Sequence, residues 1–246
     1  MSFFFAQSSP QEESGTRRRL FPRLLTRREM RCPTLAGWAL IVLVAGGVAT
    51  SWWFWGEGFL AITDRPGNEV LVVEGWIGHN GVRAAAAEFR GGKYRQIVAT
   101  GGGMTNDRWD DVKTTYAEAA ERDLVAAGVP PAAVILAIPR ETENQRTFEC
   151  ALATYSALTR QLLHPHFLTV FTIGAHARRS RAVYAKAAPP GARVGVVAWR
   201  PPGESEGPWW HSSDRAAEFL KETVGSFYEF VCDSGRAFRP AMDPAK

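Results

Sequence analysis

The 246-residue chain is poor in cysteine, with only three, and none of them forms a CxxC pair. Three cysteines are too few for a disulfide scaffold, and whether Cys150 and Cys232 pair is left open by the sequence. Histidine is also scarce, and no group of His, Cys, Asp and Glu has the spacing of a zinc site. We therefore expect neither a disulfide-rich module nor a metal centre.

The common nucleotide-binding and hydrolase motifs are missing as well. The chain contains no GxGxxG, no GxxxxGK[ST] and no GxSxG segment. Their absence argues against a dinucleotide-binding domain, a P-loop NTPase and a serine hydrolase of the usual α/β kind. The triple glycine Gly101–Gly103 matches none of these patterns.

Basic charge is scarce outside one segment. The net charge is +4, but seven arginines fall between Arg17 and Arg31, against the single acid Glu29. Without that segment the chain is near neutral to slightly acidic. The basic excess therefore belongs to the N-terminal tail, and the folded part is not expected to bind nucleic acid.

Charged residues are absent altogether from residues 32–56. The apolar run Leu35–Trp55 is long enough to cross a bilayer as a helix. Trp38 lies near one end, and Trp52, Trp53 and Trp55 lie near the other, as in an interfacial aromatic belt. The alternative, a buried core helix, would rarely lack charge over so long a run. The segment predicts a transmembrane helix over 35–56.

This helix is expected to be an uncleaved signal anchor. Its apolar run is longer than a signal-peptide core, and bulky Trp and Phe occupy the place of a small-x-small cleavage site. The arginines keep the N-terminus in the cytoplasm, so the rest of the chain lies outside, in the periplasm of a bacterium. The expected organisation is a cytoplasmic basic tail (1–34), the anchor (35–56), a linker (57–67), an α/β domain (68–232) and a C-terminal tail (233–246).

Beyond the anchor, short apolar β-branched runs alternate with helical segments. The expected strands are Val70–Val73, Gln96–Thr100, Val134–Ile138, Leu168–Ile173 and Arg193–Ala198. The expected helices are Gly81–Arg90, Asp110–Ala127, Thr142–Leu162, one from about Ala177, and Ser212–Cys232. This order predicts an α/β, Rossmann-like, three-layer parallel sheet with helices on both faces.

Residues suited to acid–base chemistry lie where the strands end. The carboxyl ends of parallel strands share one edge of the sheet, where open α/β sheets bind ligands. Glu74, Glu149 and His176 are the catalytic candidates at this edge. The structural alternative is that His176 merely caps its turn and that Glu149 favours a helix dipole.

Glycines and arginines at the same edge are suited to an anion. Glycine lets a backbone approach a ligand closely, and arginine pairs with phosphate or carboxylate. The alternatives are ordinary turns, surface arginines and a threonine that caps a helix. The candidate ligand-binding residues are Gly75, Arg83, Gly101, Gly102, Gly103, Thr147, Gly174 and Arg179.

Taken together, these segments resemble the YdcF-like proteins, the family of the SanA and ElyC envelope proteins, over about residues 69–200. The resemblance is carried by LVVEGW, Arg83, VATGGG, Gly128-Val129-Pro130, Glu141 with Thr147 and Glu149, and Thr172, His176 and Arg179. Two positions depart from the family pattern. Cys150 stands where the family has asparagine, and Thr100 stands where it has serine.

The resemblance implies a Rossmann-like domain, often membrane-anchored, that acts in envelope integrity, peptidoglycan assembly or undecaprenyl-carrier metabolism. We therefore expect binding or processing of a phosphorylated, polyprenyl-linked precursor, and the sequence leaves open whether the protein is an enzyme. One alternative is a non-catalytic scaffold for cell-wall synthesis proteins, docking through Trp209, Trp210 and the last helix (Phe219, Phe227, Phe230). The other is a binder of a nucleotide or S-adenosylmethionine, which the outside location disfavours.

Overall fold

The computed structural model of the chain describes residues 32–104, 114–142, 144–204 and 207–232. These residues fall into two units, divided within the first helix between Ala45 and Gly46. The second unit contains a five-stranded, all-parallel sheet with the strand order β3-β2-β1-β4-β5. The predicted α/β, Rossmann-like class is confirmed.

The strands are β1 (Val70–Glu74), β2 (Gln96–Thr100), β3 (Val134–Ala137), β4 (Phe167–Ile173) and β5 (Arg193–Trp199). The helices are α1 (Leu35–Leu60), α2 (Gly78–Gly92), α3 (Tyr116–Ala126), α4 (Arg146–Arg160), α5 (Ala177–Ala187) and α6 (Ser213–Cys232). Short 3₁₀ turns are η1 (Gly75–Ile77), η2 (Pro131–Ala133), η3 (Gly174–His176) and η4 (Trp209–His211). Each strand agrees with its predicted range to within one residue at either end.

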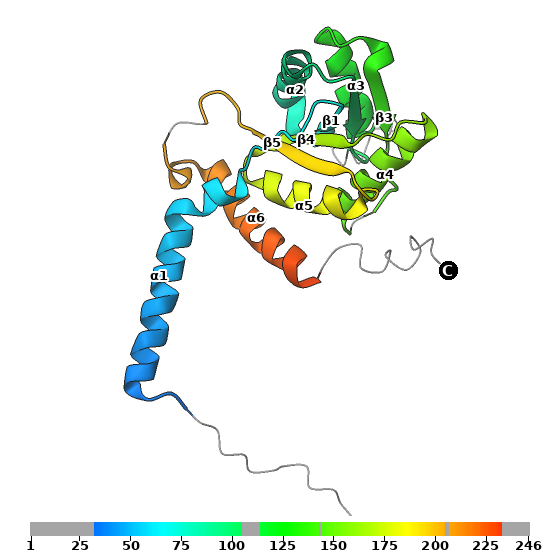
Figure 1. Cartoon of the computed structure of the whole chain (residues 1–246). Helices are drawn as coiled ribbons and strands as arrows, with labels where there is room; N and C mark the ends of the chain where they lie inside the picture. The colour runs from blue at the N-terminus through cyan, green and yellow to red at the C-terminus, as the bar shows by residue number, and fades with distance from the viewer. Residues whose placement is uncertain (1–31, 105–113, 143, 205–206, 233–246) are drawn as a thin grey trace, which may run out of the picture. The chain divides into compact units, whose positions relative to one another are not determined.

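Helices cover both faces of the sheet, α2 and α3 on one and α4 and α5 on the other (Figure 1). Successive strand residues point to opposite faces. In β1, Leu71 and Val73 pack in the cluster with α2 and α3, whereas Val70 and Val72 pack in the cluster with α4 and α5. Glu74 continues the row of Val70 and Val72, so its side chain points toward the α4 and α5 side.

Two helix ends differ from the prediction because of left-handed residues. α4 was expected from Thr142 but begins at Arg146, because Gln145 adopts a left-handed conformation with φ 54°. No side chain caps this helix, so Thr147 does not act as a cap. α2 includes both Gly91 and Gly92, and Lys93, with φ 56°, ends it.

The start of α3 is set by a capping box. The Thr115 hydroxyl accepts a hydrogen bond from the Glu118 N–H (3.1 Å), and the Glu118 carboxylate accepts one from the Thr115 N–H (2.8 Å). Both bonds satisfy N–H groups that a helix start otherwise leaves unpaired. The predicted N-terminal residues Asp110 and Asp111 lie outside the described residues.

We expect Thr115→Ala to lower the free energy of unfolding by about 1 kcal/mol, the usual effect of removing a hydroxyl cap. Urea unfolding of the full chain in detergent micelles measures it. Thr115→Ser, which keeps the hydroxyl, is the control and should stay close to the wild type. Equal losses in both variants would contradict the capping role.

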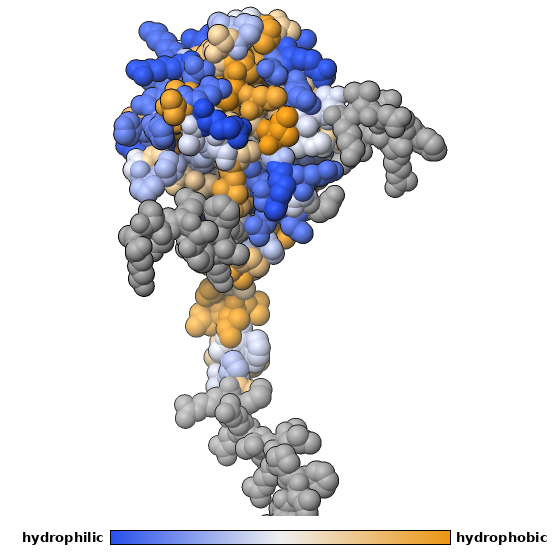
Figure 2. Space-filling view, turned by 90° about the vertical axis from the view of Figure 1, so that its right-hand side faces the viewer, coloured by the Kyte–Doolittle hydropathy of each residue, from blue (hydrophilic) through white to orange (hydrophobic). Residues whose placement is uncertain are grey.

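Among the described residues, one helix, α1, is long and apolar enough to cross a membrane. None of its most apolar 18-residue window is buried in the protein. Apolar side chains form much of its visible surface in Figure 2. The helix is compatible with the predicted single-pass anchor.

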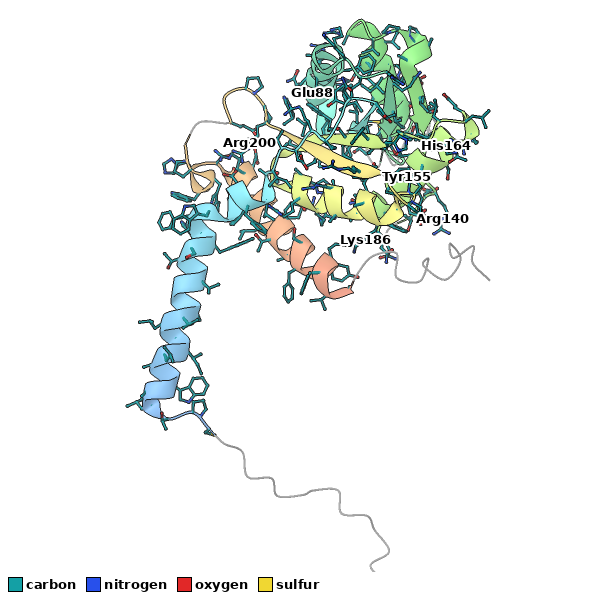
Figure 3. All side chains as sticks on the ribbon, in the orientation of Figure 1. Glu88, Arg140, Tyr155, His164, Lys186 and Arg200 are labelled. Atoms are coloured by element: carbon teal, nitrogen blue, oxygen red, sulfur yellow. The ribbon has the colours of Figure 1, made fainter. Side chains whose placement is uncertain are left out.

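The last turns of α1 belong to the fold of the second unit. The helix continues past the predicted end at residue 56 to Leu60, which is fully buried. Glu57 forms ion pairs with Arg215 (2.7 Å) and with Arg200 (3.1 Å), which is labelled in Figure 3. Asp64 exchanges two backbone hydrogen bonds with Val196 of β5. The segment predicted as a linker is therefore tied to the domain.

Candidate functional site

The strand order places a topological switch point between β1 and β4. From β1 the chain proceeds outward through β2 to β3, then returns to the other side of β1 as β4 and β5. Such switch points form the ligand crevice of open α/β sheets, outside the carboxyl ends of the strands. Glu74 ends β1 here, and Gly174 follows β4. Two of the predicted site residues are thus brought to the same place.

Glu74 lies buried beneath the start of α5, with 2% of its surface exposed. Its carboxylate accepts hydrogen bonds from the Thr172 hydroxyl and from the Ser180 hydroxyl (3.1 Å). Its Oε2 lies 3.5 Å from His176 Nε2. Burial alone raises the pKa of Glu74, but the charge of His176 and these hydrogen bonds outweigh it, so the net pKa is lowered. Glu74 is therefore a buried carboxylate, charged at neutral pH.

His176 lies between two carboxylates and is 4% exposed. Its Nδ1 is 2.9 Å from Glu222 Oε1, and its Nε2 faces Glu74. Burial alone lowers the pKa of His176, but the charge of nearby Glu74 and the hydrogen bond to Glu222 raise it to about 9. The imidazole is therefore protonated at neutral pH. It serves as a cation that bonds Glu222 through Nδ1 and lies 3.5 Å from Glu74 through Nε2, whereas a general base would need the neutral form.

Arg179 shares Glu222 with His176. Its Nε is 2.7 Å from Glu222 Oε2, and its Nη2 is 3.0 Å from Oε1, a bidentate pair. Burial alone raises the pKa of Glu222, but the hydrogen bonds from His176 and Arg179 lower it far below its ordinary value. We call Glu74, His176, Arg179 and Glu222 the switch-point cluster. Its two anions and two cations balance.

Trp76 is the cluster's exposed neighbour. It is 38% exposed, and its ring lies edge-on to His176 at 5.1 Å between centroids, with an interplanar angle of 87°. An aromatic ring in this position shields the imidazolium from water while presenting a surface to solvent.

The glycines beside the cluster make close contacts within the protein. A Cβ on Gly75 would lie 2.2 Å from the backbone oxygen of Tyr116, and one on Gly174 would lie 2.3 Å from Glu218 Oε1. Gly174 also has φ +36°, which favours glycine. The close approach predicted for a ligand is made here by α3 and α6.

The triple-glycine loop is bonded to the start of α3. The carbonyl of Gly102 accepts a hydrogen bond from the Tyr116 N–H (2.8 Å), and that of Gly101 accepts one from the Ala117 N–H (3.3 Å). Gly103 is exposed at the loop's outer end, and Arg83 is exposed on the second turn of α2. Gly103 and Arg83 remain accessible to a ligand.

The Glu149 carboxylate accepts a hydrogen bond from Arg140 (3.0 Å), which is not part of the cluster. Of the two acids predicted beside His176, Glu74 lies next to it, and the acid that bonds its Nδ1 is a third one, Glu222. Sequence reasoning missed Glu222. Glu222 is four residues from Glu218, so the two acids share one helix face. This spacing was the feature of the sequence that could have pointed to Glu222.

The other arginines of α5 also bind the protein. Arg178 donates to the Phe59 carbonyl and stacks over the Phe59 ring at 3.7 Å. Arg181 pairs with Asp64 (3.0 Å). The basic helix face thus holds the last turn of α1 and the segment that follows it.

The structure also locates the tryptophans proposed for docking, the cysteines and the potential metal ligands. Trp209 is buried and packs on Trp53 (4.5 Å between ring centroids), so it offers no docking surface. Cys150 and Cys232 are both free thiols. No group of three or more potential metal ligands occurs in the part of the chain that the structure describes.

Comparisons of the chain with protein-family models, with curated proteins and with solved structures give no match.

Proposed function

We propose that the protein is a membrane-anchored, YdcF-like domain that binds a phosphorylated, polyprenyl-linked precursor of the bacterial envelope. The observation that carries this is the start of α2 at the switch point. Gly78, His79 and Asn80 are exposed there, no side-chain hydrogen bond caps the helix, and the His79 ring lies 2.5 Å from the Asp123 carboxylate of α3. Uncapped N–H groups at a helix start attract phosphate. Arg83, one turn further on, supplies a positive charge.

The anchor supports a lipid-linked substrate. A single apolar helix ahead of the domain would tether it to a bilayer, where such a precursor resides. The arginine-rich segment before it favours a cytoplasmic N-terminus and therefore a periplasmic domain. A free nucleotide or S-adenosylmethionine, the other ligand class considered, is scarce in that compartment.

The geometry favours binding over turnover. His176 is held protonated between Glu74 and Glu222, so it orients the η3 turn and is not poised to abstract a proton. In this proposal the switch-point cluster lies beneath the site and supports it. Arg83, Trp76 and the N–H groups of α2 form the surface that the ligand touches.

The test is thermal unfolding of the full chain in detergent micelles with short-chain polyprenyl phosphates, nucleotide sugars or S-adenosylmethionine. A ligand at 100 times its Kd adds about 2.7 kcal/mol of stability, which is easily measured. We expect a shift with polyprenyl phosphate that Arg83→Ala removes.

Arg95→Ala is the matched control, an exposed arginine just ahead of β2, at the opposite edge of the sheet. It should leave the shift unchanged. A shift that survives Arg83→Ala, or no shift with any polyprenyl phosphate, contradicts the proposal.

A further inference from the structure

The C-terminal helix α6 exposes apolar side chains and turns most of its charged ones toward the protein. A surface helix of a water-soluble domain turns its apolar side inward and its charges outward. In α6 the large exposed side chains are apolar, each more than half exposed: Leu220, Val224, Phe227, Tyr228, Phe230 and Val231. From Ala217 to Cys232, all of which the structure describes, Lys221 is the one charged residue that is exposed.

Three acidic residues of α6 face the protein, whereas Asp214 in its first turn is exposed. Glu218 accepts a hydrogen bond from the Ala175 N–H (2.5 Å), and Glu222 lies in the switch-point cluster. Glu229 pairs with Lys186 of α5, which is labelled in Figure 3. The helix thus uses these three charges to attach to η3 and α5 and leaves an apolar side uncovered by the described residues.

The exposed residues form one stripe. Leu220, Val224, Phe227, Tyr228 and Val231 are three or four residues apart, the spacing of a single helix face. We call these five residues the α6 stripe. An apolar face of this extent on a domain surrounded by water would promote aggregation, so its surroundings are expected to be apolar.

The stripe is continuous with the end of the apolar helix. Phe219 stacks on Trp52 (6.1 Å between centroids), and Trp52 Nε1 donates to the Thr223 hydroxyl (3.2 Å). Gly56 makes room for Phe219, because a Cβ there would lie 2.9 Å from its ring. The α6 residues next to Leu220 and Val224 therefore contact the tryptophan that marks the membrane–water interface.

We propose that the α6 stripe lies in the interfacial region of the lipid bilayer. Amphipathic helices bind there with their apolar face among the upper acyl chains. Tyrosine at this level keeps its hydroxyl in the headgroup region, and Lys221 reaches the lipid phosphates with its extended side chain. The polar face, which such a helix usually gives to water, is covered by the domain. This surface depends on α1 spanning the membrane and is independent of the ligand proposed above.

Spin-label accessibility of the full chain in phosphatidylethanolamine–phosphatidylglycerol vesicles tests this. Labels are placed by Val224→Cys and Phe227→Cys in a Cys32→Ser, Cys232→Ser background. Cys150 can stay, because burial raises the pKa of its thiol to about 12 and leaves it unreactive. Val44→Cys in α1 is the lipid control, and Ala87→Cys, exposed on α2, is the water control.

We expect the labels at 224 and 227 to collide several-fold more with oxygen, relative to a water-soluble nickel chelate, than the label at Ala87. Their ratios should approach that at Val44. Ratios equal to that at Ala87 would overturn the proposal. So would protection from both reagents, which means a protein covers the stripe; dipolar broadening between labels would then identify that protein as a second copy. A water-exposed label at Val44 would overturn it together with the anchor.

Discussion

Glu222→Ala is expected to lower the free energy of unfolding by about 3–5 kcal/mol, the usual loss when one partner of a buried ion pair is removed. The carboxylate is 1% exposed and bonds both His176 and Arg179. Without it, Arg179 loses its bidentate partner, and His176 keeps only Glu74. Urea unfolding of the full chain in micelles, followed by circular dichroism, measures the loss.

Two variants sharpen this experiment. Lys221→Ala removes an exposed charge from the neighbouring position of α6 and should change stability by no more than about 0.5 kcal/mol. Glu222→Gln keeps the shape and an oxygen acceptor but removes the charge, so it separates electrostatics from packing. If Glu222→Ala costs less than about 1 kcal/mol, the cluster is not what attaches α6 to the sheet.

Stability is expected to fall by about 3 kcal/mol as the pH rises through about 9, because His176 then loses its proton. The pKa of His176 is raised in the folded protein, so its contribution is complete below about 6.5, the value in the unfolded chain, and is lost at higher pH. Glu74 and Glu222 have lowered pKa values, and their contributions are complete above about 4.5 and lost at lower pH. Stability should therefore be greatest between about pH 4.5 and 6.5.

The control for this pH profile is His176→Gln, which should be less stable than the wild type but should lack its slope between about pH 6.5 and 9. Titration of the His176 ring protons by NMR in the wild type provides a second measurement that needs no variant. A ring that titrates near 6.5 would contradict the arrangement between two carboxylates.

The meeting of Glu74 and His176 could be predicted because both follow buried strands, and parallel strands end at one edge. Which strands lie side by side in the sheet could not be predicted from the sequence. The pattern of apolar runs is the same whatever the strand order, so the position of β1 beside β4 depends on packing. Glu222 was missed for a related reason. It contacts His176, which is 46 residues away in the sequence, and no local pattern specifies where its helix packs.

The last helix shows what can and cannot be predicted from the spacing of apolar residues. The sequence predicted a helix over Ser212–Cys232, and α6 occupies Ser213–Cys232 with an apolar and a polar side. The sequence does not say which side of such a helix packs against the protein. In water-soluble domains the apolar side usually does. Here the acids Glu218 and Glu222 face inward. Likewise, a glycine such as Gly75 marks a close approach, but the sequence cannot distinguish a ligand from another part of the chain.

The attachment of α6 through Glu222 has a consequence for biosynthesis. Chains emerge from the ribosome N-terminus first, so strands β1 and β4 and helix α5 are synthesised before Glu222. Until α6 arrives, Arg179 has no carboxylate partner from the cluster, and the arriving helix supplies it. The last helix delivered therefore completes the sheet's charge balance. A chain cut short before α6 would remain an incomplete intermediate, open to proteolysis.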